Sequence, residues 1–161
     1  MKTIILARYG KYSRRTHRLT QNGHGQIRDL AEKLEPLIRR PAILLSSPTY
    51  PALDAAWTLG AALELISIPY RVETNPALRP RMGGGLDSEA IIDLIRAQAD
   101  KCETLVLVSA MELVQEFPDH LASSLFNQSG YAHGKKNLHP DCALVIDCEK
   151  KTMQVVSGRA H

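Results

Sequence analysis

The stretch KTIILARYG, residues 2–10, begins with apolar and β-branched side chains and then turns into a charged loop at Arg8. A short run of this kind is typical of a strand that is buried on both faces of a sheet. We therefore expect residues 2–7 to form a central strand, with Arg8 and Gly10 at its carboxyl end. Similar runs follow at residues 42–46 (AILLS) and 104–108 (TLVLV), and both are expected to be strands.

The segments between these strands carry apolar residues at helical spacing. Thr20 is a candidate N-cap for a first helix that continues to about residue 40, and Pro51 suits the first turn of a second helix. Asp87 and Ser88 are candidate caps for a third helix. A fourth helix is expected at about residues 112–126, kinked or interrupted by Pro118.

Two further patterns complete the expected sheet. A short third strand is expected at residues 70–73. Near the C-terminus, ALVID and MQVVS, residues 143–147 and 153–157, are separated by a polar turn, which is typical of a β-hairpin.

This order of elements predicts a three-layer α/β/α sandwich with a mainly parallel sheet and a C-terminal β-hairpin. The chain has 161 residues, of which 44% are hydrophobic and 23% are charged, with no repeat or linker, so we expect one domain over residues 1–161. Ligands of such sheets bind outside the carboxyl ends of the strands. The site is therefore expected among four connections, at residues 8–18, 46–51, 75–87 and 109–112.

Composition limits the classes of partner. The chain has no apolar run close to the about eighteen residues of a membrane span, and its start turns polar too early for a signal peptide, so we expect a cytoplasmic protein without a membrane partner. A net charge of +3 and 5% aromatic residues argue against nucleic-acid binding. The cysteines Cys102, Cys142 and Cys148 lack metal-site spacing and are expected to be reduced core residues. The histidines show no paired spacing on a helix face, so we expect neither a metal nor a cofactor.

Several short motifs lie at the expected connections. They are ILARYG at residues 5–10, LTQNG at 19–23, SSPTYPALDA at 46–55, PALRP at 76–80 and LVLVSAMEL at 105–113. In order, spacing and expected secondary structure they resemble the motifs of the histidine phosphatase, or phosphoglycerate mutase-like, superfamily, and particularly its short bacterial phosphohistidine phosphatases. The resemblance covers almost the whole chain and implies the α/β/α fold of that superfamily.

The same motifs lack the side chains on which the chemistry of that family depends. The family pattern has Arg-His-Gly, Ser-Ser-Pro followed by Arg-Ala, Pro-Glu-Leu-x-Pro, and Val-Ser-His. This chain has Tyr9 and Ala110 at the two histidines, Pro51 at the arginine and Ala77 at the glutamate. In the family the first histidine is phosphorylated, while two arginines and the second histidine hold the phosphoryl oxygens.

These replacements predict a catalytically inactive member, a pseudo-phosphatase with no catalytic residue intact. A phenol has an ordinary pKa of about 10, so Tyr9 is protonated at neutral pH and is a poor phosphoryl acceptor. We expect Tyr9 to fill the space of the lost histidine. Ala110 and Pro51 offer no polar side-chain group to a phosphate.

Candidate ligand-binding residues remain around the same connections. The motifs keep Gly10 and Ser47, and Arg8 is the one phosphate ligand of the family that is retained; it can bind an anion bidentately or form a structural ion pair. Residues 8–18 carry five basic side chains and no acid. Arg14 and Arg15, with Arg79 from the facing connection, can form a positive rim for a phosphorylated ligand or an acidic partner, or can be solvated loop charges.

Three functions remain open on the sequence. The preferred one is a binding module whose ligand is a phosphorylated small molecule, a phosphoprotein or another protein surface. The second is an active phosphatase that has recruited His17, His24 or His133 as nucleophile or acid. The third is a purely structural role, for instance as one half of a homo-oligomer.

Overall fold

The structure is a computed structural model and describes residues 1–66, 72–127 and 139–158. This part of the chain forms a six-stranded sheet with the order β3-β2-β4-β1-β5-β6. The strands are β1 (Thr3–Arg8), β2 (Ala42–Ser46), β3 (Glu73–Thr74), β4 (Thr104–Ser109), β5 (Cys142–Asp147) and β6 (Thr152–Ser157). Strands β1 to β4 are mutually parallel, whereas β5 and β6 are antiparallel to their neighbours.

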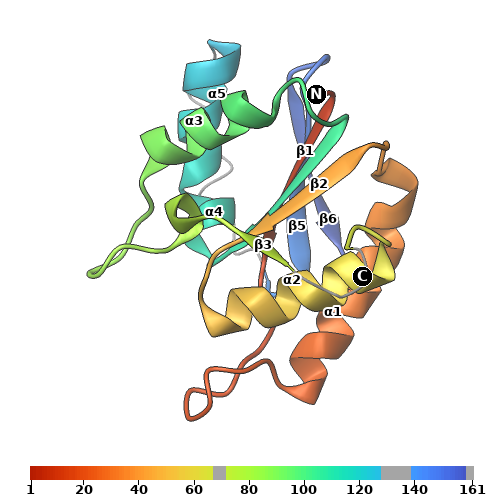
Figure 1. Ribbon diagram of the computed structural model, residues 1–161, viewed down its shortest axis with the longest axis vertical. Coiled ribbons are helices and arrows are strands. Elements are labelled where there is room, and N and C mark those ends of the chain that lie inside the picture. Colours follow the sequence, from red (N-terminus) through yellow and green to blue (C-terminus); the bar gives the residue numbers. More distant parts are fainter. Residues whose placement is uncertain (67–71, 128–138, 159–161) are drawn as a thin grey trace.

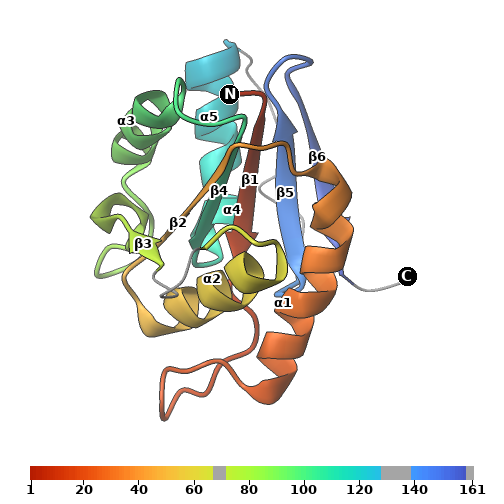
Figure 2. The ribbon, with the colours of Figure 1, turned by 45° about the vertical axis from the view of Figure 1, so that its right-hand side comes forward.

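Helices cover both faces of this sheet (Figures 1 and 2). The helices are α1 (Gln21–Leu34), α2 (Tyr50–Ala62), α3 (Ser88–Gln98), α4 (Glu112–Gln115) and α5 (Phe117–Phe126). Helices α1 and α2 pack on one face, and α3, α4 and α5 pack on the other. The predicted three-layer α/β/α sandwich with a C-terminal hairpin is confirmed.

The alternation of side chains along the central strand explains the two layers of core. In β1, Ile4 and Leu6 join the apolar cluster under α3 and α5, while Ile5 and Ala7 join the cluster under α1 and α2. Successive residues of a strand point to opposite faces, so a continuous apolar run requires helices on both sides. The prediction that this strand is central is confirmed, because β1 lies between β4 and β5.

Local capping sets where the helices begin. The Oγ1 of Thr20 accepts the N–H of Gly23 at 3.0 Å at the start of α1, and Oδ1 of Asp87 accepts the N–H of Ala90 at 3.1 Å at the start of α3. Both caps were predicted from the sequence. Pro51 lies in the first turn of α2, also as predicted.

Three boundaries differ from, or refine, the sequence prediction. The first helix ends at Leu34 rather than near residue 40, because Pro36 falls in a tight 3-10 turn, Glu35–Leu37. The predicted interruption is observed at Glu116, between α4 and α5, and Pro118 lies in the first turn of α5. The third strand, expected at residues 70–73, is observed only as Glu73–Thr74, and residues 70 and 71 lie outside the described part of the chain.

No helix in the described ranges is long and apolar enough to cross a membrane.

The central sheet should dominate the stability of the fold. Leu107 on β4 is fully buried, so Leu107→Ala should lower the free energy of unfolding by about 2–5 kcal/mol. Val155→Ala on the half-exposed strand β6 removes apolar volume as well and should cost less than about 1 kcal/mol. Urea denaturation of both variants would test this, and equal losses would contradict the assigned core.

Candidate functional site

The carboxyl ends of four adjacent parallel strands form the floor of the candidate site. Arg8 pairs with Ser109, and Ser46 pairs with Val108 and with Thr74. The hydrogen bonds continue past the strand ends, because the N–H of Tyr9 donates to the carbonyl of Ser109 at 3.2 Å. The predicted connections therefore leave from one edge of the sheet. We call the surface formed by residues 9–20, 47–50, 75–87 and 110–111 the mouth.

The loop of residues 9–20 is fixed to α1 by a close backbone contact. The N–H of Lys11 donates to Oε1 of Gln26 at 3.0 Å, and the carbonyl of Lys11 accepts the N–H of Thr20 at 2.9 Å. A Cβ on Gly23 would lie 2.1 Å from the Lys11 carbonyl oxygen, and one on Gly10 would lie 2.6 Å from the Gly23 oxygen. Gly10 thus permits this approach, and the structure gives it a packing role.

A bidentate ion pair ties the same loop to α2. Arg18 donates from Nε to Oδ2 of Asp54 at 2.8 Å and from NH2 to Oδ1 at 2.7 Å, and the N–H of Leu19 donates to Oδ2 at 3.0 Å. Burial alone would raise the pKa of Asp54, but these hydrogen bonds and the charge of Arg18 outweigh it and lower that pKa. The Arg18 guanidinium also lies 5.9 Å from the centre of the Tyr50 ring. Arg18 is therefore engaged within the protein.

At the base of the mouth, Arg8 and Tyr9 are half-buried. Burial lowers the pKa of Arg8, although Tyr9, Cys142 and Glu112 act in the opposite direction. Burial raises the pKa of Tyr9, and the neighbouring Tyr12 raises it further. The Tyr9 and Tyr12 rings meet edge to face, with centroids 5.3 Å apart and planes at 88°. Tyr9 is thus a neutral ring packed against a second aromatic ring.

Glu112 is the site residue that the sequence analysis missed. It begins α4, which packs against β1, and its carboxylate interacts electrostatically with both Arg8 and Tyr9. Its Oε2 is buried and has no hydrogen-bond partner within the described ranges. The charge of Glu112 therefore acts on Arg8, the side chain that was expected to bind a phosphate. The sequence signal that could have identified it is an acidic residue two positions after Ala110, in the stretch VSAME.

The remaining family positions border the mouth and are apolar or engaged locally. Pro51 and Ala110 are buried, and Ala77 lies in the 3-10 turn Pro76–Leu78, where its N–H donates to Oδ1 of Asn75 at 2.9 Å. The Ser47 hydroxyl is buried and lies 3.2 Å from the Thr49 hydroxyl. The predicted ligand residue Ser47 thus serves the turn into α2.

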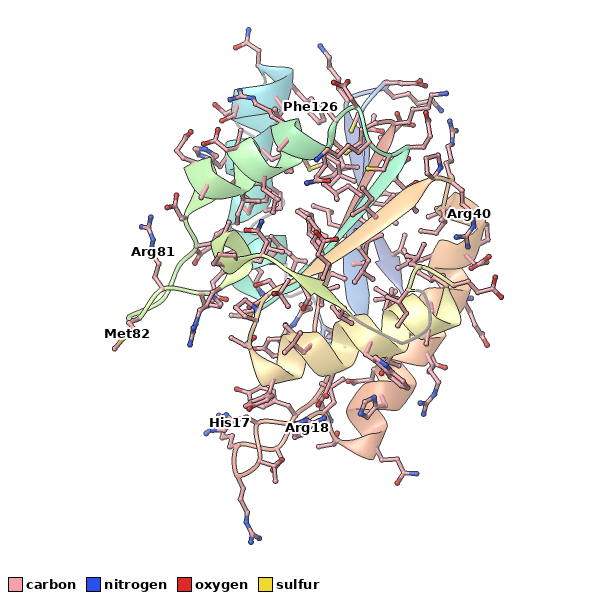
Figure 3. The ribbon with its side chains drawn as sticks, viewed as in Figure 1. His17, Arg18, Arg40, Arg81, Met82 and Phe126 are labelled. Carbon is pink, nitrogen blue, oxygen red and sulfur yellow. The ribbon has the colours of Figure 1, made fainter. Side chains whose placement is uncertain are left out.

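The predicted positive rim is exposed but belongs to separate loops. Arg14, Arg15 and Arg79 are exposed. Arg81, beyond Arg79, forms an ion pair with Asp87 at 3.3 Å. Figure 3 shows Arg18 beside α2 and Arg81 at the base of another loop. Arg14, Arg15 and Arg79 therefore lie on connections that leave the same edge of the sheet.

The histidines proposed as recruited catalytic groups do not gather at Arg8 either. His17 is exposed in a backbone turn with φ of 58°. His24 lies on α1, and its Nδ1 is 2.7 Å from the hydroxyl of Thr58 on α2. His133 lies outside the described residues. Among the residues that are described, no group of three His, Cys, Asp or Glu is placed to hold a metal ion.

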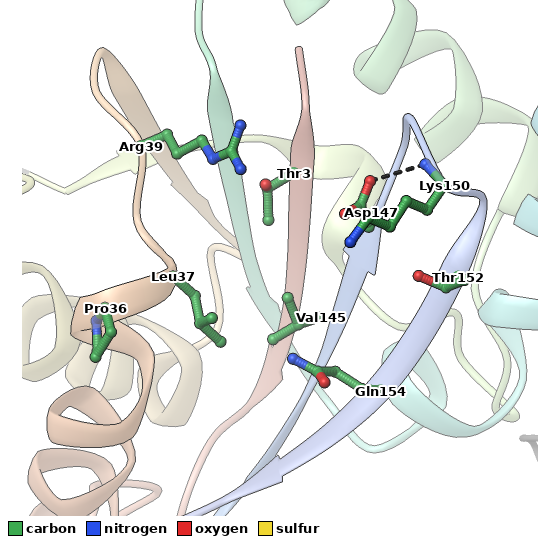
Figure 4. A pocket seen from close by; sticks show the side chains of 9 residues that line it. All are labelled: Thr3, Pro36, Leu37, Arg39, Val145, Asp147, Lys150, Thr152 and Gln154. Carbon is green, nitrogen blue, oxygen red and sulfur yellow. Dashed lines mark hydrogen bonds between the residues drawn. The ribbon is translucent and has the colours of Figure 1, made fainter.

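A hollow lies beside the amino end of β1, where Thr3 belongs to its lining (Figure 4). It has a volume of about 270 Å³ and lies between the 3-10 turn after α1 and the hairpin β5–β6. The cations Arg39 and Lys150 line it together with the carboxylate of Asp147. Oδ1 of Asp147 accepts the N–H of Lys150 at 2.9 Å, so this carboxylate holds the hairpin turn.

Comparison with known proteins places this arrangement in a known fold. No family model and no curated protein matches the sequence. The chain is, however, similar to a solved structure of the protein histidine phosphatase SixA complexed with tungstate, with 19% identity, a TM-score of 0.72 and 97% of each chain covered. The chain has the histidine phosphatase fold.

Two other solved structures share the histidine phosphatase fold with this chain. One is a mycobacterial glucosyl-3-phosphoglycerate phosphatase with inorganic phosphate, with 14% identity, a TM-score of 0.68 and 100% of each chain covered. The other is the product of open reading frame Rv3214 of Mycobacterium tuberculosis, with 16% identity, a TM-score of 0.65 and 98% of this chain and 99% of that chain covered. The resemblance inferred from the motifs is confirmed at the level of the fold.

The ion pair of Arg18 with Asp54 should make a contribution to the free energy of unfolding that is lost in acid. Because folding lowers the pKa of Asp54, its contribution is complete above its ordinary pKa of about 4 and is lost as pH falls through the lower folded value. Asp54→Asn should therefore reduce the free energy of unfolding by about 0.5–1 kcal/mol at pH 7 and by less below pH of about 4. Denaturation at several pH values, with the exposed Asp93→Asn as control, tests this; a loss independent of pH would contradict it.

The charge of Glu112 should weaken oxyanion binding at Arg8. Glu112→Gln keeps the size of the side chain and removes its charge, so it should strengthen tungstate binding by roughly tenfold. Glu116→Gln, an exposed position after α4, should leave tungstate binding unchanged. Calorimetric titration measures both, and an unchanged affinity for Glu112→Gln would show that its carboxylate does not act on this site.

Proposed function

We propose that this chain is a non-catalytic binding module with the histidine phosphatase fold, and that its mouth binds a partner without transferring a phosphoryl group. The observation that supports this proposal is the set of side chains bordering the mouth. Tyr9 and Ala110 replace the two family histidines, while Pro51 and Ala77 replace the arginine and the glutamate. The strand ends around them keep their pairing, so the scaffold persists without the reactive groups.

The chemistry at Arg8 supports the absence of turnover. Loss of a catalytic nucleophile costs about a millionfold in turnover in a well-studied protease, and this chain lacks two further phosphate contacts as well. A neutral Tyr9 phenol does not attack phosphorus readily, because its raised pKa keeps the oxygen protonated. The carboxylate of Glu112 beside Arg8 opposes the negative charge of a phosphate ester.

A second candidate is a module that reads a phosphorylated small molecule or phosphoprotein. Its support is Arg8, which keeps the position of a phosphate ligand of the family at the end of β1. The solved structures with tungstate and with inorganic phosphate show that proteins of this fold bind tetrahedral oxyanions. In this candidate Arg8 contacts the oxyanion, and Arg14, Arg15 and Arg79 attract it.

Turnover and binding should be measured on the same sample. We expect no hydrolysis of p-nitrophenyl phosphate or of a phosphohistidine peptide above the rate of the Arg8→Gln variant. Hydrolysis that is lost on His17→Ala or His24→Ala would overturn the proposal in favour of a recruited histidine. Tungstate or phosphohistidine binding that is lost in Arg8→Gln, without turnover, would select the phosphate-reading candidate.

A further inference from the structure

One loop of the mouth, residues 9–20, exposes several basic side chains and contains no acid. Residues 9–20 carry Lys11, Arg14 and Arg15, all of them exposed, and no Asp or Glu. Arg18 of the same loop is neutralised by Asp54, whereas those three cations form no ion pair within the part of the chain that the structure describes. The loop therefore presents uncompensated positive charge to a partner.

Large apolar side chains are exposed beside these cations. Tyr12 is 37% exposed, Tyr50 63% and Met111 41%. They belong to three connections that leave adjacent strands, β1, β2 and β4. Tyr, Met and Arg are the side chains enriched at the centres of protein interfaces, whereas a site for a small phosphate needs no exposed aromatic ring.

The two tyrosines are held in place before any partner binds. The Tyr12 ring packs edge to face on Tyr9, and the Tyr12 backbone bridges to Leu19 across the loop. The Tyr50 ring lies under the Arg18 guanidinium, which Asp54 fixes. Rings that are already ordered lose little conformational entropy on binding, which favours their use as anchors.

The base and the rim of the mouth carry different charges. At the base, the carboxylate of Glu112 acts electrostatically on Arg8 without forming an ion pair with it, and therefore opposes the binding of a dianion there. At the rim, Lys11, Arg14 and Arg15 are spread along the loop and suit several single charges better than one double charge. At the opposite end of the sheet, Lys2 lies within ion-pair distance of both Glu103 and Glu149.

We infer that the mouth is a docking surface for an acidic segment of a partner protein, whose carboxylates pair with Lys11, Arg14 and Arg15 while an apolar side chain packs on Tyr50 and Met111. This inference rests on the proposed non-catalytic function and names its partner class. It requires no phosphate on the partner, because the contacts lie at the rim and not at Arg8.

The probe for this inference is a short fluorescent peptide of Glu residues with interspersed Phe. Its binding to the full chain is measured by fluorescence anisotropy, beside a peptide in which Gln replaces every Glu. The double variant Arg14→Glu, Arg15→Glu should weaken binding by more than roughly tenfold. The matched control Lys150→Glu, Lys151→Glu changes the same charge in the β5–β6 turn and should leave the affinity unchanged.

Tyr50→Ala separates docking from simple charge attraction. This substitution changes no charge, so it should weaken binding of the acidic peptide by roughly three- to tenfold only if the ring is an anchor. The inference would be overturned if the Lys150 and Lys151 control weakened binding equally, or if Tyr50→Ala had no effect on affinity. Equal binding of the Gln peptide would overturn it as well. So would a peptide in which phosphoserine replaces one Glu, if it binds far more tightly and its binding depends on Arg8.

The two proposals fail in different ways on these samples. Hydrolysis of a phosphate ester would overturn the non-catalytic function, whatever the peptide does. Absence of both hydrolysis and peptide binding would overturn only the acidic partner, and would leave the non-catalytic scaffold in place.

Discussion

The parallel pairing of β1 with β4, continued into β2, is the constraint on which the rest of this structure depends. These strands are apolar on both faces, so each face must be covered by helices, and the chain has to return across the sheet between successive strands. The connections after the strands consequently collect at one edge. Arg8, Ser46 and Ser109 become neighbours there although they are far apart in the sequence. The mouth exists because of this register, whatever side chains occupy it.

Within that frame, the charge balance at Arg8 differs from what a phosphate site requires. A site for a phosphoryl group concentrates positive charge and hydrogen-bond donors around one point. In this chain, Pro51 and Ala110 have no side-chain donor, Tyr9 offers only a neutral hydroxyl, and the negative charge of Glu112 acts on Arg8. Exposed basic side chains lie on the loop of residues 9–20, at the rim of the mouth. These features support the proposed association with a partner without transfer of a group.

The loop that carries these charges is ordered by contacts with both α1 and α2. Gln26 and Gly23 hold its beginning through Lys11, and Asp54 holds its end through Arg18 and Leu19. Such an arrangement lowers the entropy cost of presenting side chains to a partner. It also means that Arg18, although basic and exposed, contributes to the shape of the mouth and not to its uncompensated charge.

The sequence by itself determined the layers and most element boundaries. Those features depend on neighbours along the chain: apolar runs, the caps Thr20 and Asp87, and prolines in first turns. Only the tertiary structure decided that Arg18 is paired with Asp54, thirty-six residues away, and that Glu112 faces Arg8. Such pairs depend on which helix crosses which strand end and on side-chain direction, and no local pattern records either.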